Sequence, residues 1–444
     1  MTRRRPSMHT FICVISLSAV VFTSHPTTVL CAEAPICGRL CEIDGVRVLH
    51  LWGSSHERGY AHGYLLGEDI LRLFDGYLKE VIRKEDALRE FEQAARTRLR
   101  AMNIPRRYAD ELRGMLTGIQ TRLGEKARLA AFDRLIEYDD LVAINCIPEL
   151  GRVCCSSFAA WGPMTTDGGT ISGRNLDWHR LRTLRGTHLI IAYCDDAPNE
   201  AEISEQHSSL GWVSVTWPGF IGCLTGMNAD GVTVSMHDAP GPRPTAPLGF
   251  TPRGLALRLA IESACGSTAY EDVRRVLSAH LAAVGNNVPV TFPSMRNKAA
   301  AVVFEYDGDL KNNMGLTVRL PDGTGRKKSA PDAATAFLTC TNHYVKRAAP
   351  TACDRYSRID QRLASLAGNG KPVDLPEAWS ILRSVACRVG PGQPLETYHS
   401  VVFEPNRRVM HVAFSSADKP AADNPPIRLD VAQLLEVQKV SASR

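Results

Sequence analysis

A layered α+β fold is predicted by the way helical and strand-like patterns divide the sequence. From about residue 40 to about residue 150 the apolar residues recur mainly at helical spacing, whereas short strand-like segments dominate after Cys155. The helical segments of this second part stand in two blocks and do not alternate with single strands. Runs of strands and blocks of helices are typical of layered α+β domains, while alternation would indicate repeated βαβ units.

The first part opens with a strand-like segment and continues as helices. Residues 46–52 are strand-like, and a helix is predicted over residues 57–73. In that helix Gly59 and Gly63 share one face, which would allow close packing on a neighbouring helix. Longer charged amphipathic helices are predicted over residues 77–100, 106–123 and 138–145.

The second part consists of strand-like segments that are bounded by turn residues. These strands are predicted over residues 156–161, 170–173, 188–193, 212–217, 232–236, 299–306, 334–339, 398–403 and 408–414. Helices are predicted in one block over residues 252–264 and 270–282, and in a second block over residues 357–367 and 375–386. Linker-like composition marks residues 239–252 and 321–331.

Composition places the chain among ordinary globular proteins. Of its 444 residues, 44% are hydrophobic and 22% are charged, which excludes fibrous and disordered classes. The formal net charge is +5, and Arg3, Arg4 and Arg5 at the N-terminus supply three of these positive charges. The remaining balance gives no reason to expect a nucleic-acid partner.

The first 32 residues have the pattern of an export signal. A basic cluster is followed by the apolar segment 11–22 and by small residues around position 32. We expect cleavage there and export to the periplasm or the extracellular space. An uncleaved anchor is the alternative, but the apolar segment is shorter than the roughly 20 residues that a spanning helix needs. Stable membrane insertion is therefore not expected.

Thirteen cysteines are many for a cytosolic protein, and export would allow disulfides to persist. Cys37 and Cys41 are close enough in sequence to form a bridge. Cys340, Cys353 and Cys387 fall in one C-terminal region, and the sequence leaves their connectivity open.

Motifs for metals and nucleotides are missing from the sequence. It contains no CxxC pair and no HExxH motif, so no zinc site is predicted. It also lacks a Walker loop, a GxGxxG motif and a GxSxG elbow. We expect no metal and no organic cofactor.

The most informative stretch runs from Cys155 to Trp178. It resembles the N-terminal nucleophile hydrolases of the acyl-coenzyme A:6-aminopenicillanate acyltransferase type and, more distantly, the choloylglycine hydrolases. The resemblance continues in order through Gly59–Gly63, Gly226–Gly231, Thr341-Asn342-His343, Tyr356-Ser357-Arg358 and residues 397–413.

The resemblance implies a four-layer αββα sandwich and a precursor that cuts itself between Cys154 and Cys155. The chain would then consist of a signal peptide (1–32), a helical pro-region or α-chain (33–154) and a catalytic β-chain (155–444), with the two chains remaining associated. The implied substrate is a small molecule with a linear acyl amide bond, which the enzyme would hydrolyse or use for acyl transfer.

The residue types fit that chemistry. A thiolate is the nucleophile, and the α-amine of an N-terminal cysteine, whose unperturbed pKa is near 8, can take the thiol proton. Arg174 follows Cys155 on the return strand of a predicted hairpin and can favour the thiolate. Asp177 can accept a hydrogen bond from the α-ammonium group. The resemblance assigns these roles to the same two residues.

The resemblance also implies roles for more distant residues. Asn342 matches an asparagine that serves the tetrahedral intermediate, and Arg358 matches a distal active-site arginine. One departure is Asp238, preceded by His237, where the related enzymes carry an asparagine for the oxyanion hole. Because a carboxylate would repel an oxyanion, either a backbone N–H serves there or the match is displaced by a residue or two. Asn228 is a further candidate or a turn residue.

Other interpretations remain open from the sequence. Cys155 could be half of a disulfide, and Cys154 could be the nucleophile instead. The chain could be a secreted binding or structural protein on an inactive form of the same fold, or a hydrolase that uses His343 or His237 as its base. Four tryptophans could line an acyl pocket or belong to the core: Trp161, Trp178, Trp212 and Trp217.

Overall fold

The computed structural model describes residues 36–436, except for 83–84, 151–153, 195–209, 241–248, 281, 295–298, 308–314, 322–335, 350 and 391. The chain divides into a unit Met1–Pro35 and a unit Ile36–Arg444. The predicted signal peptide and most of both predicted linkers thus lie outside the described residues. No helix in the described part combines the length and the apolar composition needed to cross a bilayer.

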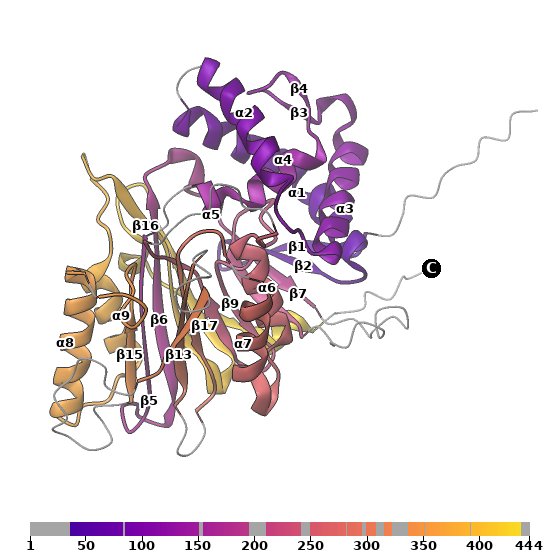
Figure 1. Ribbon diagram of the computed structural model, residues 1–444. Helices are drawn as coiled ribbons and strands as arrows, with labels where there is room; N and C mark the ends of the chain where they lie inside the picture. Colours follow the sequence, from indigo (N-terminus) through magenta and orange to yellow (C-terminus); the bar gives the residue numbers. More distant parts are fainter. Residues whose placement is uncertain are drawn as a thin grey trace, which may run out of the picture. The chain divides into compact units, whose positions relative to one another are not determined.

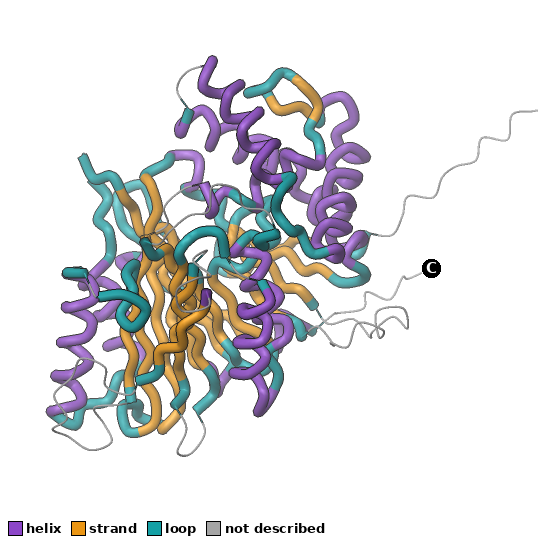
Figure 2. Tube along the Cα trace, viewed as in Figure 1, coloured by secondary structure: helices purple, strands orange, loops and turns teal. Residues whose placement is uncertain are grey.

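Two sheets form the centre of the second unit (Figures 1 and 2). The first has the order β1 (Gly38–Ile43), β2 (Val46–Leu51), β7 (Leu189–Tyr193), β8 (Trp212–Thr216), β9 (Thr225–Asn228), β10 (Thr233–Ser235), β12 (Asn286–Thr291), β13 (Ala301–Tyr306) and β14 (Leu316–Arg319), with β11 (His237–Asp238) paired to β12. The second has the order β15 (Phe337–Cys340), β5 (Cys154–Gly162), β6 (Gly168–His179), β16 (Leu395–Glu404), β17 (Val409–Phe414) and β18 (Ile427–Asp430). Strands β2 and β7 are parallel, and the other named neighbours are antiparallel.

The two sheets pack face to face through apolar side chains of both. One core cluster joins Val48, Ile190 and Val213 of the first sheet to Val401 and Val412 of the second. Alternating side chains along each strand leave the opposite faces to be covered by helices.

Helices complete the outer layers. Helices α6 (Arg253–Ser263) and α7 (Ala269–Ala279) share a core cluster with the first sheet, and α8 (Asp354–Gly368) and α9 (Leu375–Val385) share one with the second. Figure 1 shows the two helix pairs on opposite sides of the sheets. The predicted four-layer αββα sandwich is confirmed.

The region before Cys154 forms helices and also extends the first sheet. Its helices are α1 (Ser55–Val81), α2 (Glu85–Leu99), α3 (Arg106–Leu123), α4 (Tyr138–Asn145) and α5 (Ile147–Leu150). A Cβ atom added at Gly59 or Gly63 would collide with the backbone of α3, so the predicted close packing at these glycines is confirmed. Strands β1 and β2 also come from this region, and β2 joins β7 of the later sequence. This region is therefore an integral part of the sandwich.

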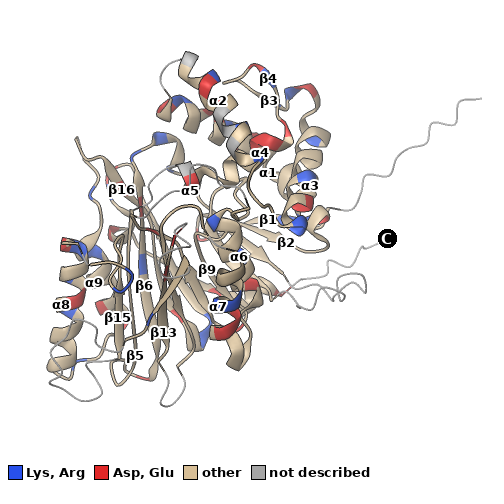
Figure 3. Ribbon diagram, in the orientation of Figure 1, with Lys and Arg blue, Asp and Glu red and all other residues tan. Residues whose placement is uncertain are grey.

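The remaining elements are small. Strands β3 (Arg128–Leu129) and β4 (Arg134–Leu135) form a separate ribbon, and α10 (Val431–Leu435) follows β18. Charged residues gather on the helices, whereas the sheets carry few of them (Figure 3). This distribution agrees with sheets that are covered on both faces.

Candidate active site

A hairpin of β5 and β6 brings Cys155 and Arg174 together. Cys155 stands opposite Leu176 and Ser157 opposite Arg174, so these side chains point to the face that packs on the first sheet. Arg174 Nη2 lies 3.0 Å from Cys155 Sγ. The strand register thus places the Arg174 guanidinium beside the Cys155 sulfur.

The Arg174 side chain is buried and surrounded by acceptors from the first sheet. Its guanidinium donates to the carbonyl oxygens of Leu224 (3.1 Å) and Met236 (2.9 Å) and to the Thr225 hydroxyl. His399 Nε2 lies 3.1 Å from Nη1, and burial together with Arg174 lowers the pKa of that imidazole well below its ordinary value. A neutral His399 can accept a hydrogen bond, so the guanidinium is held in place.

The Cys155 thiol is protonated near neutral pH in the full-length chain. Burial raises its pKa to about 11, while Arg174 opposes the shift and Asp177 adds to it. The thiol donates to the carbonyl oxygen of Met236 over 3.3 Å. Nucleophilic attack therefore requires a base to remove this proton.

Asn342 holds the main chain of Cys155. Its Oδ1 accepts from the Cys155 N–H at 2.7 Å, and its Nδ2 donates to the Asp238 carbonyl oxygen at 2.8 Å. Asn342 Oδ1 also accepts from Arg355 Nη2 at 2.9 Å. The amide thus lies beside the nitrogen that would become the amino terminus after cleavage.

Asp177 lies on the other face of β6, opposite Cys154. Its carboxylate accepts from Arg355 Nη1 at 2.7 Å and from Thr397 Oγ1 at 2.5 Å. Burial raises the pKa of Asp177, and Arg355 and Thr397 oppose the rise. Arg355 therefore connects Asp177 to Asn342, a bridge that was not predicted.

On α8 it is Arg355, and not the predicted Arg358, that contacts Asp177 and Asn342. Arg358 lies three positions later with an exposed side chain, whereas Arg355 is half-buried. Positions three apart on a helix differ by about 60° in direction, which is enough to separate a site residue from a surface one. The predicted residue therefore lies on the same helix as the arginine that makes these contacts, but it points in another direction.

The three oxyanion candidates have different surroundings. Asn228 donates to the carbonyl oxygens of Ile261 and Ala264 and accepts from the Val232 N–H, so it holds a turn against the end of α6. His237 is buried in β11, and burial, reinforced by Arg174, lowers its pKa well below the ordinary value.

Asp238 is the candidate that reaches the site. Its carboxylate forms an ion pair with Arg253, and its carbonyl oxygen accepts from Asn342. The conflict expected between this carboxylate and an oxyanion is thereby reduced, because a buried guanidinium neutralises the charge.

A second thiol near the site has a lowered pKa. Cys353 Sγ lies 3.5 Å from Thr341 Oγ1, which lies 3.0 Å from His343 Nδ1. Burial alone would raise the pKa of Cys353, but hydrogen bonds with His343 and Thr341 lower it to about 6. Of the predicted alternative bases, His343 thus interacts with Cys353.

The suggested Cys37–Cys41 bridge is wrong, because Cys41 carries a free thiol in β1. Residues four apart on a strand are separated by about 13 Å, well beyond disulfide range. Cys155 is also a thiol, which leaves it available as a nucleophile. Cys340, Cys353 and Cys387 are thiols as well.

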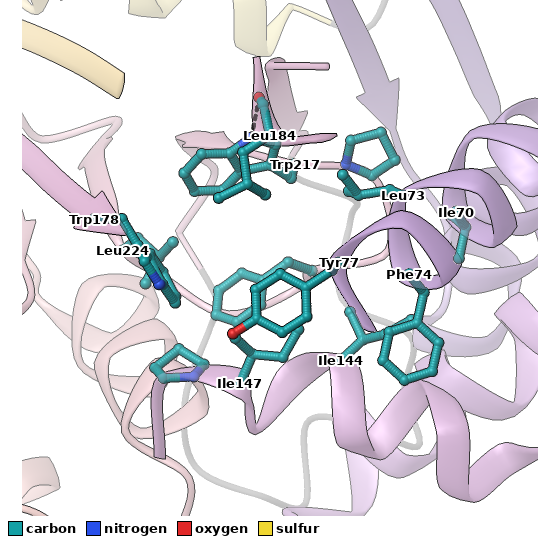
Figure 4. A pocket seen from close by; sticks show the side chains of 13 residues that line it. Ile70, Leu73, Phe74, Tyr77, Ile144, Ile147, Trp178, Leu184, Trp217 and Leu224 are labelled. Atoms are coloured by element: carbon teal, nitrogen blue, oxygen red, sulfur yellow. Dashed lines mark hydrogen bonds between the residues drawn. The ribbon is translucent and has the colours of Figure 1, made fainter. Parts of the chain in front are cut away.

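An apolar pocket adjoins the hairpin, and the space between its walls is about 510 Å³ when its opening to solvent is included. Its wall comes from both sides of the predicted cut (Figure 4). The lining residues are Ile70, Leu73, Phe74, Tyr77, Ile144, Ile147, Pro148, Trp178, Leu184, Trp217, Pro218, Phe220 and Leu224. Trp178 follows Asp177 in β6, and the carbonyl oxygen of Leu224 accepts from Arg174, so the pocket begins beside these candidate site residues.

Only two of the four candidate tryptophans line this pocket. Trp178 and Trp217 meet edge to face with ring centroids 6.3 Å apart. Trp161 belongs to the core beneath α8 and α9, and Trp212 stacks on Tyr193. The default expectation of core packing therefore holds for these last two.

Residues of the predicted pro-region hold the pocket wall in position. His62 Nε2 accepts from the Gly219 N–H at 3.0 Å. Asn145 donates to the Gly219 carbonyl oxygen at 3.0 Å and accepts from the Ile221 N–H at 2.8 Å. The loop that carries Trp217 and Phe220 thus depends on contacts with the predicted pro-region.

Comparisons with known proteins give partial similarities. No family model matches the chain. Protein dcd1B of Dictyostelium discoideum is 30% identical over 202 residues, which cover 41% of this chain and 36% of that protein. An uncharacterized protein of Archaeoglobus fulgidus is 24% identical over 225 residues, covering 44% and 33%. The matched part is thus only about a third of the length of these curated relatives.

Solved structures with similar chains include three enzymes. An orthologue of N-acylethanolamine-hydrolyzing acid amidase from Caenorhabditis elegans has 19% identity and a TM-score of 0.39, covering 57% of this chain and 93% of that chain. A mutant of conjugated bile acid hydrolase from Clostridium perfringens has 13% identity and a TM-score of 0.41, covering 64% and 94%. Penicillin V acylase from Agrobacterium tumefaciens has 13% identity and a TM-score of 0.40, covering 63% and 87%.

Proposed function

We propose that this chain is an exported, self-processing amidohydrolase or acyltransferase with Cys155 as its nucleophile. The observation that carries the proposal is the pair of contacts at Cys155: Arg174 at 3.0 Å from the sulfur and Asn342 at 2.7 Å from the main-chain nitrogen. A cation and an amide around one buried thiol are suited to acyl transfer through a thioester.

Self-cleavage would begin at the peptide between Cys154 and Cys155. The Cys155 sulfur attacks the Cys154 carbonyl carbon while its thiol proton passes to the nitrogen of the same peptide bond, and the C–N bond breaks to give a thioester and an α-amine. Water then hydrolyses the thioester, leaving the Cys154 carboxylate and a free Cys155 thiol with an α-amine. Asn342 supports this step because it orients the peptide nitrogen that becomes the leaving group.

Turnover of a substrate would use the new α-amine as base. The amine removes the thiol proton, the thiolate attacks the amide carbonyl of the substrate, and the protonated amine product leaves. Water or an acceptor amine then resolves the thioester. We assign the oxyanion contact to the Asn342 amide, as the resemblance implies, and the thiolate is favoured throughout by Arg174.

The apolar lining of the pocket supports a substrate whose acyl group is apolar and binds there. None of its 13 lining residues carries a charged side chain, and Trp178 and Leu224 connect it to the reactive groups. Burying an apolar chain of several methylenes would contribute about 0.8 kcal/mol for each of them. A fatty or aromatic acyl amide therefore fits better than a peptide with a charged side chain.

The decisive experiment follows the fate of the full-length chain. Wild-type protein should separate into two fragments on a denaturing gel, and the larger one should begin at Cys155. Cys155→Ala should stay as one chain, while Cys154→Ala should still be cut, because only its carbonyl group takes part. An uncut wild-type chain without amidase activity would instead favour the binding protein on an inactive fold.

A further inference from the structure

A buried arginine joins the segment before the cut to the catalytic domain. The Arg253 main-chain N–H donates to Glu149 Oε1 at 2.7 Å, and Arg253 Nε lies 3.3 Å from Glu149 Oε2. The guanidinium also donates to the Pro148 carbonyl oxygen, to the Gly285 carbonyl oxygen at 3.2 Å and to the Asp238 carboxylate. The Arg253 side chain has no exposed surface.

The contacts of Arg253 continue to the reactive cysteine through two residues. Asp238 pairs with Arg253 through its carboxylate, and its carbonyl oxygen accepts from Asn342 Nδ2 at 2.8 Å. Asn342 Oδ1 in turn accepts from the Cys155 N–H at 2.7 Å. Arg253 thus connects both sides of the proposed scissile peptide bond. On one side it binds Glu149, five positions before Cys154, and on the other side it is linked through Asp238 and Asn342 to Cys155.

Stability alone does not explain such a cluster. One guanidinium and two carboxylates are removed from water here, and the cost of desolvation offsets much of their attraction. Burial raises the pKa of Glu149, and Arg253 opposes that rise. A fixed, branched set of hydrogen bonds does, however, give directional control over the groups that it joins.

We propose that Arg253 is a positioning residue for self-cleavage, which holds the chain at Glu149 and the Asn342 amide in one frame so that the Cys154 carbonyl lies against the Cys155 sulfur. This inference rests on the proposed function, since it assigns a part in that cleavage. The same contacts keep Ile147 and Pro148 in the pocket wall after the cut.

The test measures how fast the full-length precursor is cut after cell-free synthesis. Glu149→Gln and Asp238→Asn keep the side-chain shapes but weaken the ion pairs of these residues with Arg253. Each substitution should slow cleavage roughly tenfold to a hundredfold. Arg253→Met should be cleaved more slowly than either of these variants. Arg253→Lys keeps the charge and should recover part of the rate that Arg253→Met loses.

The matched control is Arg258, on the same helix and equally buried. It pairs with Glu111 of α3 and with Glu262, so it also joins the pro-region to α6, and its guanidinium donates to the Ile221 carbonyl oxygen. Glu111→Gln should lower the melting temperature without slowing cleavage below that temperature. Circular dichroism on each variant in a Cys155→Ala background verifies that the precursor is folded.

Two results would overturn the inference and leave the proposed function standing: cleavage of Glu149→Gln and Asp238→Asn at the wild-type rate, or equal slowing by Glu111→Gln. If the wild-type chain is never cut, the proposed function itself fails and this inference with it.

Discussion

The main-chain nitrogen of Cys155 donates a hydrogen bond of 2.7 Å to Asn342 Oδ1, although 187 positions separate the two residues. This nitrogen would become an amine on cleavage. Asn342 would then face a group that can carry positive charge, and its amide oxygen could accept from either form. The contact is therefore compatible with both the precursor and the mature enzyme.

Arg174→Lys should lower turnover by about two orders of magnitude, because a lysine cannot reproduce the branched contacts with Cys155, Thr225 and the two carbonyl oxygens. The pH dependence of Cys155 alkylation in the mature protein should move to higher pH, since the charged end of the shorter lysine side chain cannot keep the 3.0 Å contact with the sulfur. Arg174 is buried, with 1% of its surface exposed. For the same reason the variant should also melt at a lower temperature, and an unchanged alkylation profile would contradict the assignment.

Arg355→Gln should reduce cleavage and turnover, whereas Arg358→Ala should leave both close to wild type. Only Arg355 touches Asp177 and Asn342. Rates of the two purified variants, measured side by side, separate these positions. A loss in Arg358→Ala with wild-type rates in Arg355→Gln would return the role to Arg358.

The ion pair of Asp177 with Arg355 predicts a pH effect on stability. Burial raises the pKa of Asp177 above its unfolded value, and Arg355 limits that rise. Because the folded state binds this proton more tightly, the contribution of the carboxyl group to stability falls as the pH rises from its unfolded pKa to its folded pKa. Arg355→Gln should therefore destabilise the fold more at about pH 7 than at about pH 4, near the ordinary carboxyl pKa. Urea unfolding of both proteins at the two pH values measures the difference.

Filling the pocket should change the choice of acyl chain. Ile144→Trp places a larger side chain among Phe74, Tyr77 and Phe220. The KM for a long-chain acyl amide should rise about tenfold or more, while that for an acetyl amide should change little, because the lost volume matters only to a substrate that occupies it. A parallel rise for both substrates would mean that the acyl chain binds elsewhere.

Cys353 should be the first thiol to be alkylated in the Cys155→Ala precursor. Hydrogen bonds with His343 and Thr341 outweigh burial and lower its pKa to about 6, so it is mostly thiolate at about pH 7. Cys265 is exposed, but its pKa is raised by partial burial and by Asp230, and it provides the comparison. Mass spectrometry after brief iodoacetamide treatment should find Cys353 labelled first, and preferential labelling of Cys265 would contradict the prediction.

Local pattern alone was enough for several elements. The helices at Arg106–Leu123 and Tyr138–Asn145 have the predicted bounds, because amphipathic spacing depends only on neighbours in the sequence. By contrast, β12 was missed, since Asn286, Asn287 and Pro289 are unfavourable in strands and are accepted there by pairing with β13. The predicted helix over residues 77–100 is divided between α1 and α2.

The sequence by itself determined the layered fold class and the pairing of Cys155 with Arg174, because a hairpin between consecutive strands is a local event. Only the tertiary structure placed Arg355 and not Arg358 against Asn342, linked Arg253 to Glu149 and Asp238, and built the pocket from both sides of the proposed cut. Those choices depend on helix rotation, on strand register and on contacts between segments more than 100 positions apart. No pattern of neighbouring residues encodes them, since packing selects among side chains that are equivalent in sequence.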